Sequence, residues 1–239
     1  MNDLVLLTGG SGLIGRAVGQ SLIGEGFRVA LVGRNHTSQL NGRLENSSDF
    51  LFFAMDLFEW RPTEENPLCS LPDVYGFVHL ARTRDSLNGP SSSREDWLRE
   101  YEMATYIPYS LGTWLAEHRG VERIILSSSI YGFSAQQLKL YDSESSLNPH
   151  YGASRAAVSQ LVRDMAVRLA PKCTVNAVAW GGVSEGTNPS IRKTYSEVSP
   201  SGRMLSPEEA AAPVKFLLSR GASGVTGTTV HADGGWLAI

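Results

Sequence analysis

Tyr151 and Arg155 are two side chains capable of proton chemistry, and they stand four residues apart. If residues 151–169 are helical, positions i and i+4 share one face, so the phenol and the guanidinium point into the same space. A free phenol has a pKa of about 10 and is a poor base at neutral pH, but a nearby cation stabilises its ionised form. The spacing predicts a tyrosine that exchanges a proton, with Arg155 as its supporting cation.

A cluster of hydroxyl groups precedes this pair. Ser127, Ser128 and Ser129 follow residues 123–126, which are predicted to form a strand. At the end of such a strand, one of these hydroxyls is placed to hydrogen-bond a substrate oxygen. Serines in loops also satisfy backbone groups, and that alternative remains open.

Residues 4–15 begin the elements that must position these groups. Four apolar residues suit a buried parallel strand, and the glycines that follow let the backbone turn into a helix from about Leu13. Such a turn aims helical N–H groups at the sheet edge, where a pyrophosphate fits. Glycine-rich turns also occur simply because they let a strand and a helix pack closely. Here, however, the order of elements is that of a dinucleotide fold: a strand, the glycine turn, a helix at 15–25 and a strand at 28–32.

Two further positions concern the nucleotide. The second strand ends at Arg34 without a carboxylate for a ribose hydroxyl, and arginine pairs with a 2′-phosphate, so NADP is favoured over NAD. An ordinary solvated arginine is the alternative. Asp56 follows a third strand, 50–55, and either accepts the adenine amino group, with Leu57 bonding through its backbone, or caps the next helical turn.

The rest of the chain continues the alternation of strands and helices. Arg82 and Arg84 follow a fourth strand and are placed to receive an anionic substrate group or a cofactor phosphate, although loop arginines held by surface carboxylates explain them equally well. An apolar stripe from Trp97 to Leu115 predicts core or a subunit contact. Strands are predicted at 74–80, 123–126, 174–179 and 228–232, and helices at 94–118 (interrupted near Pro108), 151–169 and 207–218.

The composition indicates one globular domain. With 239 residues, we expect a single domain over 1–239, with a polar substrate lid around 184–204. The net charge of −3 argues against nucleic acid as a partner, and no apolar run is long enough to span a membrane. We therefore expect a cytoplasmic protein. Cys69 and Cys173 lie far apart and the five histidines are scattered, so neither a disulfide nor a metal site is expected.

Over essentially its whole length the chain resembles the short-chain dehydrogenase/reductase family. The likeness rests on the glycine turn 8–15, the serine motif 128–132, the segment 175–178 and the C-terminal pattern 225–236. It implies a doubly wound, Rossmann-type α/β/α fold with about seven parallel strands. It also implies NAD(P)-dependent hydride transfer to a carbonyl or from a secondary alcohol, in a homodimer or homotetramer.

The resemblance also assigns roles to residues. Ser129 would hold the substrate oxygen, Tyr151 would act as general acid or base, and Arg155 would replace the family's lysine. Val183 would bond the nicotinamide carboxamide through its backbone. The implied cofactor-binding residues are Gly9, Ser11, Gly12, Leu13, Ile14, Gly15, Arg34, Asp56, Leu57, Ala81, Tyr151, Arg155 and Val183.

Several positions depart from the family pattern. Besides Arg155, the chain has Ala104 for an expected asparagine, the run 79–82 for Asn-Asn-Ala-Gly, and Trp180 for a proline. The leading interpretation is an NADP-preferring oxidoreductase for a small substrate that is sugar-like or anionic. One alternative binds the dinucleotide without turnover, as a sensor or a subunit of a complex. The other is a non-redox epimerase or dehydratase of a sugar nucleotide.

Overall fold

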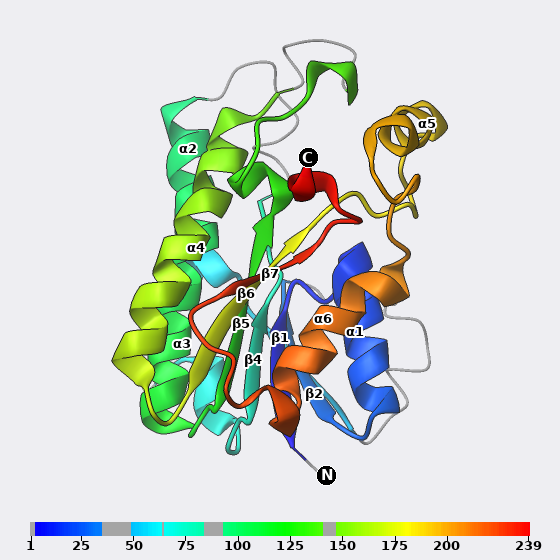
Figure 1. Cartoon of the computed structure of the whole chain (residues 1–239). Coiled ribbons are helices and arrows are strands. Elements are labelled where there is room, and N and C mark those ends of the chain that lie inside the picture. Colours follow the sequence, from blue (N-terminus) through cyan, green and yellow to red (C-terminus); the bar gives the residue numbers. More distant parts are fainter. Residues whose placement is uncertain (1–2, 35–48, 64, 84–92, 141–146) are drawn as a thin grey trace.

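The computed structural model describes residues 3–34, 49–63, 65–83, 93–140 and 147–239. They form one sheet of seven parallel strands in the order β3-β2-β1-β4-β5-β6-β7, with helices on both faces (Figure 1). The expected doubly wound Rossmann-type α/β fold is confirmed. The strands are β1 (Leu4–Thr8), β2 (Arg28–Gly33), β3 (Phe50–Ala54), β4 (Gly76–His79), β5 (Arg123–Ser129), β6 (Thr174–Trp180) and β7 (Thr229–Ala232).

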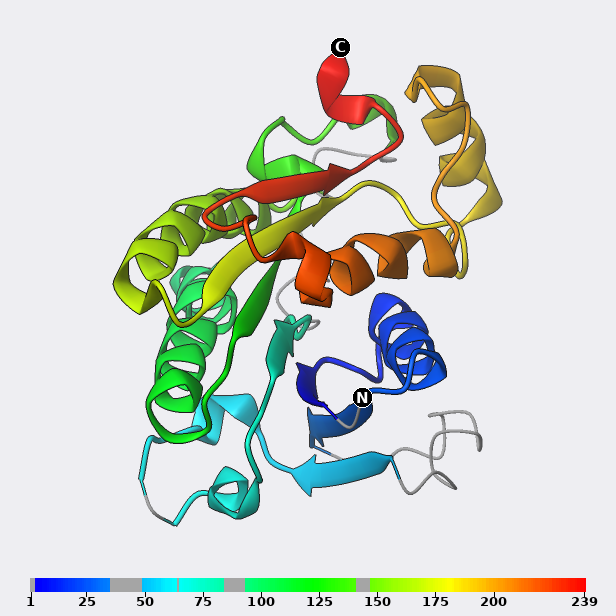
Figure 2. The same cartoon turned by 60° about the horizontal axis from the view of Figure 1, so that its bottom comes forward.

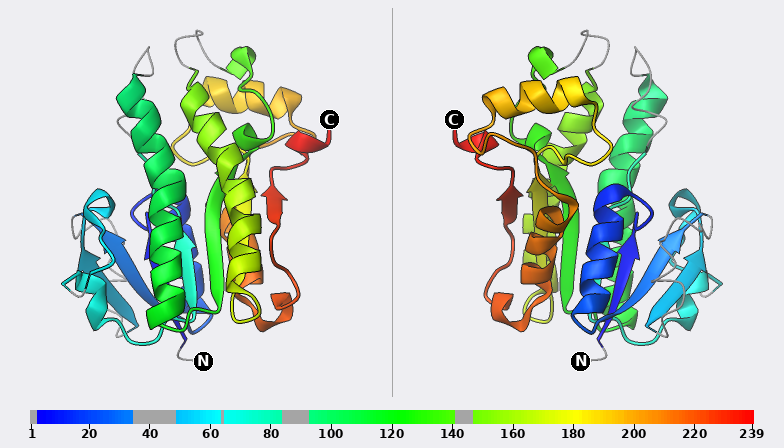
Figure 3. Two further views of the ribbon diagram at one scale, coloured as in Figure 1. Left: turned by 90° about the vertical axis from the view of Figure 1, so that its left-hand side faces the viewer. Right: turned by 90° about the vertical axis from the view of Figure 1, so that its right-hand side faces the viewer.

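The helices form the outer layers. They are α1 (Leu13–Gly24), α2 (Arg94–Tyr101), α3 (Ile107–His118), α4 (Pro149–Leu169), α5 (Pro189–Val198) and α6 (Pro207–Leu218). Figures 2 and 3 show α2, α3 and α4 over one face of the sheet, and α1 with α6 over the other. Strand β1 shows why both faces are covered: Leu4 and Leu6 pack on the α3–α4 side, and Val5 and Leu7 on the α1–α6 side.

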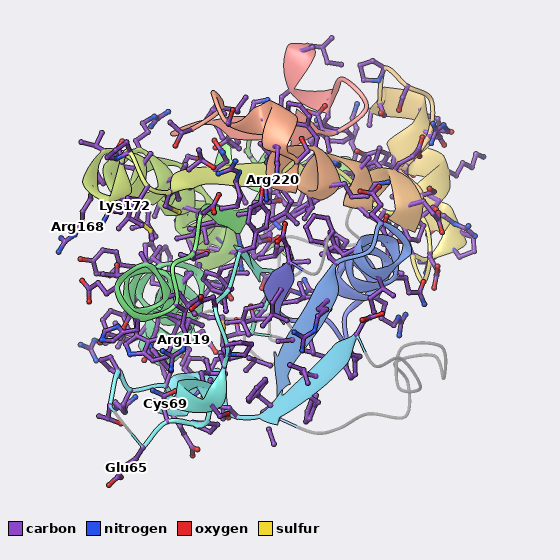
Figure 4. The ribbon with its side chains drawn as sticks, turned by 90° about the horizontal axis from the view of Figure 1, so that it is seen from below. Glu65, Cys69, Arg119, Arg168, Lys172 and Arg220 are labelled. Carbon is purple, nitrogen blue, oxygen red and sulfur yellow. The ribbon has the colours of Figure 1, made fainter. Side chains whose placement is uncertain are left out.

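The strand order reverses between β1 and β4, because β1 pairs with β2 on one side and with β4 on the other. In an open parallel sheet, ligands bind beyond the carboxyl ends of the strands at this point. Helix α5 and the C-terminal turn Trp236–Ala238 lie at that end (Figure 1). Figure 4 shows the opposite end, where Arg119, Arg168, Lys172 and Arg220 lie away from the ligand edge.

The long helical segment is interrupted earlier than predicted. A π-helical turn, Glu102–Tyr106, separates α2 from α3, and Pro108 lies in the first turn of α3. Proline has no N–H to offer the carbonyl of Ala104, and its ring crowds that carbonyl. The wider turn before Pro108 accommodates both effects.

Two other segments differ from expectation. Strand β5 continues through Ser129, because β6 pairs with it up to the Ser129–Trp180 register. The predicted lid contains α5, whose start is capped by Asn188, since its side chain accepts a hydrogen bond from the backbone of Ser190 at 2.9 Å. No helix within the described ranges combines the length and the hydrophobicity that crossing a bilayer requires.

Candidate active site

Gly9 and Gly15 shape the turn between β1 and α1. Gly9 has a φ of +73°, and a Cβ there would lie 2.5 Å from the backbone nitrogen of Ala81. A Cβ at Gly15 would overlap the carbonyl oxygen of Gly9. Glycine at these positions therefore lets α1 start directly against β1 and against the segment that follows β4.

Gly12 is less crowded than Gly9 and Gly15. Its φ is −73°, and among the described atoms a Cβ would meet only the carbonyl oxygen of Gly9, at 3.3 Å. As the N-cap of α1 it offers no side-chain acceptor, and the first turn of α1 carries no acidic residue. The N–H groups of that turn are open to an anionic ligand.

We predict that Gly12→Ala leaves the thermal midpoint of unfolding nearly unchanged but weakens dinucleotide binding at least about tenfold, because the added methyl group occupies the anion's place. Fluorescence titration with NADPH measures the binding and thermal unfolding measures the stability. Gly24→Ala, at the other end of α1 with open space around it, is the matched control. Unchanged NADPH binding in Gly12→Ala would show that the ligand does not sit on this turn.

A cavity of about 960 Å³ extends along the carboxyl ends of the strands. This volume suits a cofactor together with a small substrate. Arg84 lies outside the described residues. The cavity wall contains the other residues for which a catalytic, substrate-binding or cofactor-binding role was predicted, namely Gly9, Ser11, Gly12, Leu13, Ile14, Gly15, Arg34, Asp56, Leu57, Ala81, Arg82, Ser129, Tyr151, Arg155 and Val183.

Arg34 and Asp56 both line the cavity near the ends of β2 and β3. Arg34 is exposed and has no ion pair within the described chain. The Asp56 side chain accepts a hydrogen bond from the backbone of Phe58 at 3.0 Å. Of the two interpretations of Asp56, the structure shows the helical cap, and its place on the cavity wall leaves the adenine contact as a prediction.

The serines at the end of β5 make backbone contacts. Ser128 donates a hydrogen bond to the carbonyl of Arg155 at 3.0 Å, so its role is to join β5 to α4. The Oγ of Ser129 accepts a hydrogen bond from the backbone of Tyr131 at 3.2 Å. Its hydroxyl hydrogen has no acceptor among the described residues. Ser129 is therefore buried, held in place and still able to donate to a ligand.

Tyr151 and Arg155 share a face of α4, as the spacing predicted, but they do not form an exposed pair. The Arg155 side chain is 1% exposed, and its Nη2 lies 2.6 Å from Oε1 of Glu100, which is fully buried. Its Nη1 donates to the carbonyl of Ser127 at 3.1 Å, and its Cζ lies 4.9 Å from the centre of the Tyr151 ring. The charge of the predicted supporting cation is therefore balanced by Glu100, a partner that the spacing did not predict.

Glu100 is the polar residue that the sequence analysis missed. Its carboxylate accepts hydrogen bonds from Thr83 and, at 3.3 Å, from Ser154, in addition to the Arg155 contact. A signal was present: Glu100 lies three residues after Trp97 and four before Ala104, on the apolar stripe. A carboxylate on a buried helical face requires a partner, and a buried arginine supplies it.

Comparison with known proteins identifies the family. Residues 121–237 match the sequence profile of the family described as enoyl-(acyl carrier protein) reductase. Over 96% of its length the chain is 28% identical to 3-oxoacyl-[acyl-carrier-protein] reductase FabG of Aquifex aeolicus (strain VF5), spanning 95% of that protein. It is also 25% identical to the 7alpha-hydroxysteroid dehydrogenase of Bacteroides fragilis, and this match covers 98% of the chain and 94% of that protein. The chain belongs to the short-chain dehydrogenase/reductase family.

Solved structures share the fold. The TT0495 protein of Thermus thermophilus matches with a TM-score of 0.81 and 27% identity, over all of both chains. A short-chain dehydrogenase of Leptospira borgpetersenii, solved with bound NAD+, matches with a TM-score of 0.83 and 22% identity, over 99% of this chain and 93% of the other. The second likeness is evidence for the fold alone.

His79 replaces the first asparagine of a motif that most short-chain dehydrogenases/reductases carry after the fourth strand. It is buried, and its Nε2 lies 2.9 Å from the carbonyl of Met103, so Nε2 carries the hydrogen. Its Nδ1 then accepts from the Thr8 hydroxyl at 2.9 Å. Burial, with a smaller contribution from the nearby Arg155, lowers the pKa of His79 from 6.5 to about 3, and the hydrogen bond to the Met103 carbonyl opposes this shift. His79 is a neutral bridge between β1, β4 and the π-helical turn.

We predict that His79 makes stability depend on pH. Between pH 6.5 and 3 the unfolded chain binds a proton that the folded protein excludes. This contribution is complete above pH 6.5 and is lost as the pH falls, at up to about 1.4 kcal/mol per pH unit. Urea unfolding at a series of pH values gives the change of the free energy of unfolding with pH. This slope should be shallower for His79→Gln than for the parent. It should equal the parent's slope for His118→Gln, which changes a histidine on the surface. Equal slopes in parent and His79→Gln would refute the assignment.

Two other departures from the family pattern are resolved. Trp180, which stands where the family has a proline, lines the cavity; its indole donates a hydrogen bond to the carbonyl of Ala210 at 2.8 Å, and the side chain is 5% exposed. It therefore joins β6 to α6. Arg82 is exposed on the cavity wall and has no carboxylate partner within the described ranges. The surface ion pair considered for Arg82 is not seen there.

The segment after β6 is held by Tyr195 of α5. The Tyr195 hydroxyl accepts a hydrogen bond from the backbone of Gly182 at 3.0 Å, and its ring stacks on Trp236 with centres 4.6 Å apart. Burial raises the pKa of the Tyr195 phenol, so it stays protonated. Val183 forms a parallel bridge with Leu205, which fixes its backbone at the cavity wall.

The residues present fit a nicotinamide dinucleotide, which short-chain dehydrogenases/reductases bind. The uncapped start of α1 at Gly12 suits the pyrophosphate, and the fixed backbone at Val183 lies on the same cavity wall as Ser129 and Tyr151. The cavity joins these groups to Arg34 and Asp56 near the ends of β2 and β3. The donor set and the space are both those of a dinucleotide site.

Proposed function

We propose that the protein is an NADP-preferring reductase of a small carbonyl substrate, or the corresponding alcohol dehydrogenase. One observation carries this proposal: Ser129 and Tyr151 both line the cavity that begins at the uncapped start of α1. Neither the Ser129 hydroxyl hydrogen nor the Tyr151 phenol oxygen has a hydrogen-bond partner among the described residues. Both remain available to the two sides of one substrate oxygen.

Each group has a role that follows from its contacts. The glycine turn would hold the dinucleotide, which would supply a hydride for the carbonyl carbon. Ser129, held by the backbone of Tyr131, donates a hydrogen bond to the carbonyl oxygen. Tyr151 gives its phenolic proton to that oxygen as the C=O bond becomes a C–O–H group, and oxidation runs the same steps backwards.

The preference for NADP rests on Arg34, and we predict that Arg34→Ala raises the dissociation constant of NADPH about tenfold and leaves that of NADH within twofold, since an exposed charge pair with the 2′-phosphate is lost. Arg28→Ala, at the other end of β2, is the matched control. Calorimetric titration with both dinucleotides measures the difference. Equal losses for NADPH and NADH would contradict the assignment of Arg34.

Besides the charged residues Glu95, Asp96 and Arg99, the cavity wall includes apolar and uncharged polar groups. Leu140, Ile191 and Met204 line the cavity together with Gln136 and Thr187. Such a wall suits a small hydroxylated compound, and the exposed guanidinium of Arg82 on the same cavity wall supports an anionic group on it. We therefore propose a small substrate that is sugar-like or anionic.

Single-turnover oxidation of NADPH against a panel of small carbonyl compounds tests the function. We expect NADPH to bind, and its absorbance to fall only when a suitable carbonyl compound is present. Tight binding without oxidation by any carbonyl would overturn the proposal in favour of a dinucleotide sensor. Isomerised or dehydrated sugar nucleotide without net NADPH consumption would favour the non-redox alternative.

A further inference from the structure

We propose that Glu100 is a positioning residue for the proton-transfer step: through Arg155 it fixes the ring of Tyr151 and balances the positive charge beside it. This inference rests on the proposed function. Glu100 lies on α2 and does not itself line the cavity, so a residue of α2 would influence the proton transfer by Tyr151 on α4.

The contacts of Glu100 connect four parts of the chain around the proposed acid. From α2, its Oε1 contacts Nη2 of Arg155 at 2.6 Å and the hydroxyl of Ser154 at 3.3 Å, both on α4. Its Oε2 accepts from Thr83, in the segment after β4. Arg155 extends the connection to the carbonyl of Ser127 on β5 at 3.1 Å. The carboxylate therefore determines where the guanidinium lies.

The guanidinium in turn supports the ring of Tyr151. Its Cζ lies 4.9 Å from the ring centre, in the range of a cation–π contact. A side chain of this length has many rotamers, and the ion pair with Glu100, together with the Ser127 carbonyl, selects one of them. Without Glu100, the guanidinium of Arg155 would no longer be held in one position beside the Tyr151 ring.

Glu100 also sets the charge near the phenol. Arg155 is 1% exposed, so water does not screen it, and Glu100 is the carboxylate that contacts it. The other titratable groups next to Arg155 are Tyr151 on its own helix and His79 of β4, which burial keeps neutral because its pKa is about 3. Removing the charge of Glu100 leaves a net positive charge beside the phenol, which favours its ionised form.

The backbone that carries Glu100 is itself fixed. The π-helical turn Glu102–Tyr106 follows directly, and His79 bonds the carbonyl of Met103 within it at 2.9 Å. α2 and the π-helical turn both pack against α4. π-Helical turns often occur where a helix places a functional side chain. Here the turn begins two residues after Glu100, whose carboxylate contacts Arg155.

The test is Glu100→Gln, which keeps the size of the side chain and removes its charge. At neutral pH we expect kcat/KM for the carbonyl substrate to fall about tenfold, with the dissociation constant of NADPH within twofold of the parent. The alkaline limb of the reduction rate should move to lower pH, since Tyr151 must be protonated to act. Glu102→Gln, two residues along, is the matched control and should leave both unchanged.

Two further measurements separate positioning from general damage. In an Arg155→Met background, Glu100→Gln should change kcat/KM less than twofold, because Glu100 acts through Arg155. In the dinucleotide-free protein, tyrosinate absorbance should appear at lower pH in Glu100→Gln than in the parent, and this difference should vanish when Tyr151→Phe is added. Burial raises the pKa values of two other phenols, Tyr75 and Tyr195, so these ionise at higher pH.

If Glu100→Gln does not fold, the double variant Glu100→Leu/Arg155→Met replaces the pair by apolar side chains of similar size. The inference then requires this variant to fold and bind NADPH but to reduce the substrate at least about tenfold more slowly. Equal effects of Glu100→Gln in both backgrounds, an unmoved tyrosinate signal, or full activity of the double variant would overturn it. Failure of the proposed function would look different: the parent would bind NADPH and reduce no carbonyl, while the tyrosinate shift would remain.

Discussion

Tyr151→Phe is expected to lower kcat for carbonyl reduction by about 10²–10⁴-fold, because the proton donor is removed while the ring and its contact with Arg155 remain. The phenol oxygen makes no hydrogen bond within the described chain, so the substitution breaks none there. NADPH should bind to the variant as tightly as to the parent. Single-turnover oxidation of NADPH measures the rate and fluorescence titration measures the binding.

The control for this variant is Tyr106→Phe, which removes a hydroxyl from a tyrosine that is 55% exposed on the π-helical turn. It should leave both the rate and the binding unchanged. A Tyr151→Phe protein with the parent's kcat would exclude Tyr151 as the acid. Loss of NADPH binding alone would instead show that Tyr151 serves the cofactor.

Glu100→Ala should lower the free energy of unfolding by about 3–5 kcal/mol, because it leaves the guanidinium of Arg155 buried without its counter-charge. Replacing both members, as in Glu100→Leu/Arg155→Met, should recover most of this loss, since well-packed apolar side chains carry no desolvation cost. Urea unfolding at pH 7 measures both values. A loss below about 1 kcal/mol in Glu100→Ala would mean that water reaches Arg155.

Glu209→Ala provides the comparison with a surface pair. Arg203 contacts both carboxylate oxygens of Glu209 at 2.7 Å, and both side chains are exposed. The pair with Arg203 lowers the pKa of Glu209 to about 2. Solvent screens this pair, so its loss should cost less than that of the buried pair, although Glu209 also caps α6. The contrast isolates burial as the cause of the large effect at Glu100.

Much of the site was predictable because it is built from local patterns. The glycines of residues 8–15 directly follow an apolar run, and their spacing alone places the start of α1 at the strand edge. Tyr151 and Arg155 fall on one helical face because they stand four residues apart, which is close to one helical turn. The C-terminal landmarks identified the family, and a family's sheet order then follows from its topology.

The remaining features depend on contacts between distant segments. The pair of Glu100 and Arg155 joins residues that lie 55 positions apart, and the indole of Trp180 finds its acceptor 30 positions away. Neither partner is encoded by spacing. The sequence predicted a supporting cation at Arg155 but not its partner, because helical geometry specifies the face of a side chain but not what the neighbouring helix offers it.

The Arg155 contacts also change the chemical account. An arginine with a free charge would hold the phenol ionised, whereas an arginine paired with Glu100 contributes mainly position. The ion pair with Glu100 therefore determines how Arg155 acts on Tyr151.

Transfer of deuterium from NADPH labelled at its reactive carbon tests the central claim most directly. The parent protein is incubated with the labelled cofactor and the carbonyl compound that it reduces fastest, and the product is analysed by mass spectrometry and NMR. We predict deuterium on the carbinol carbon and none on the oxygen, whose proton comes from Tyr151 and exchanges with water. Bound cofactor that transfers no label to any carbonyl compound would contradict the account.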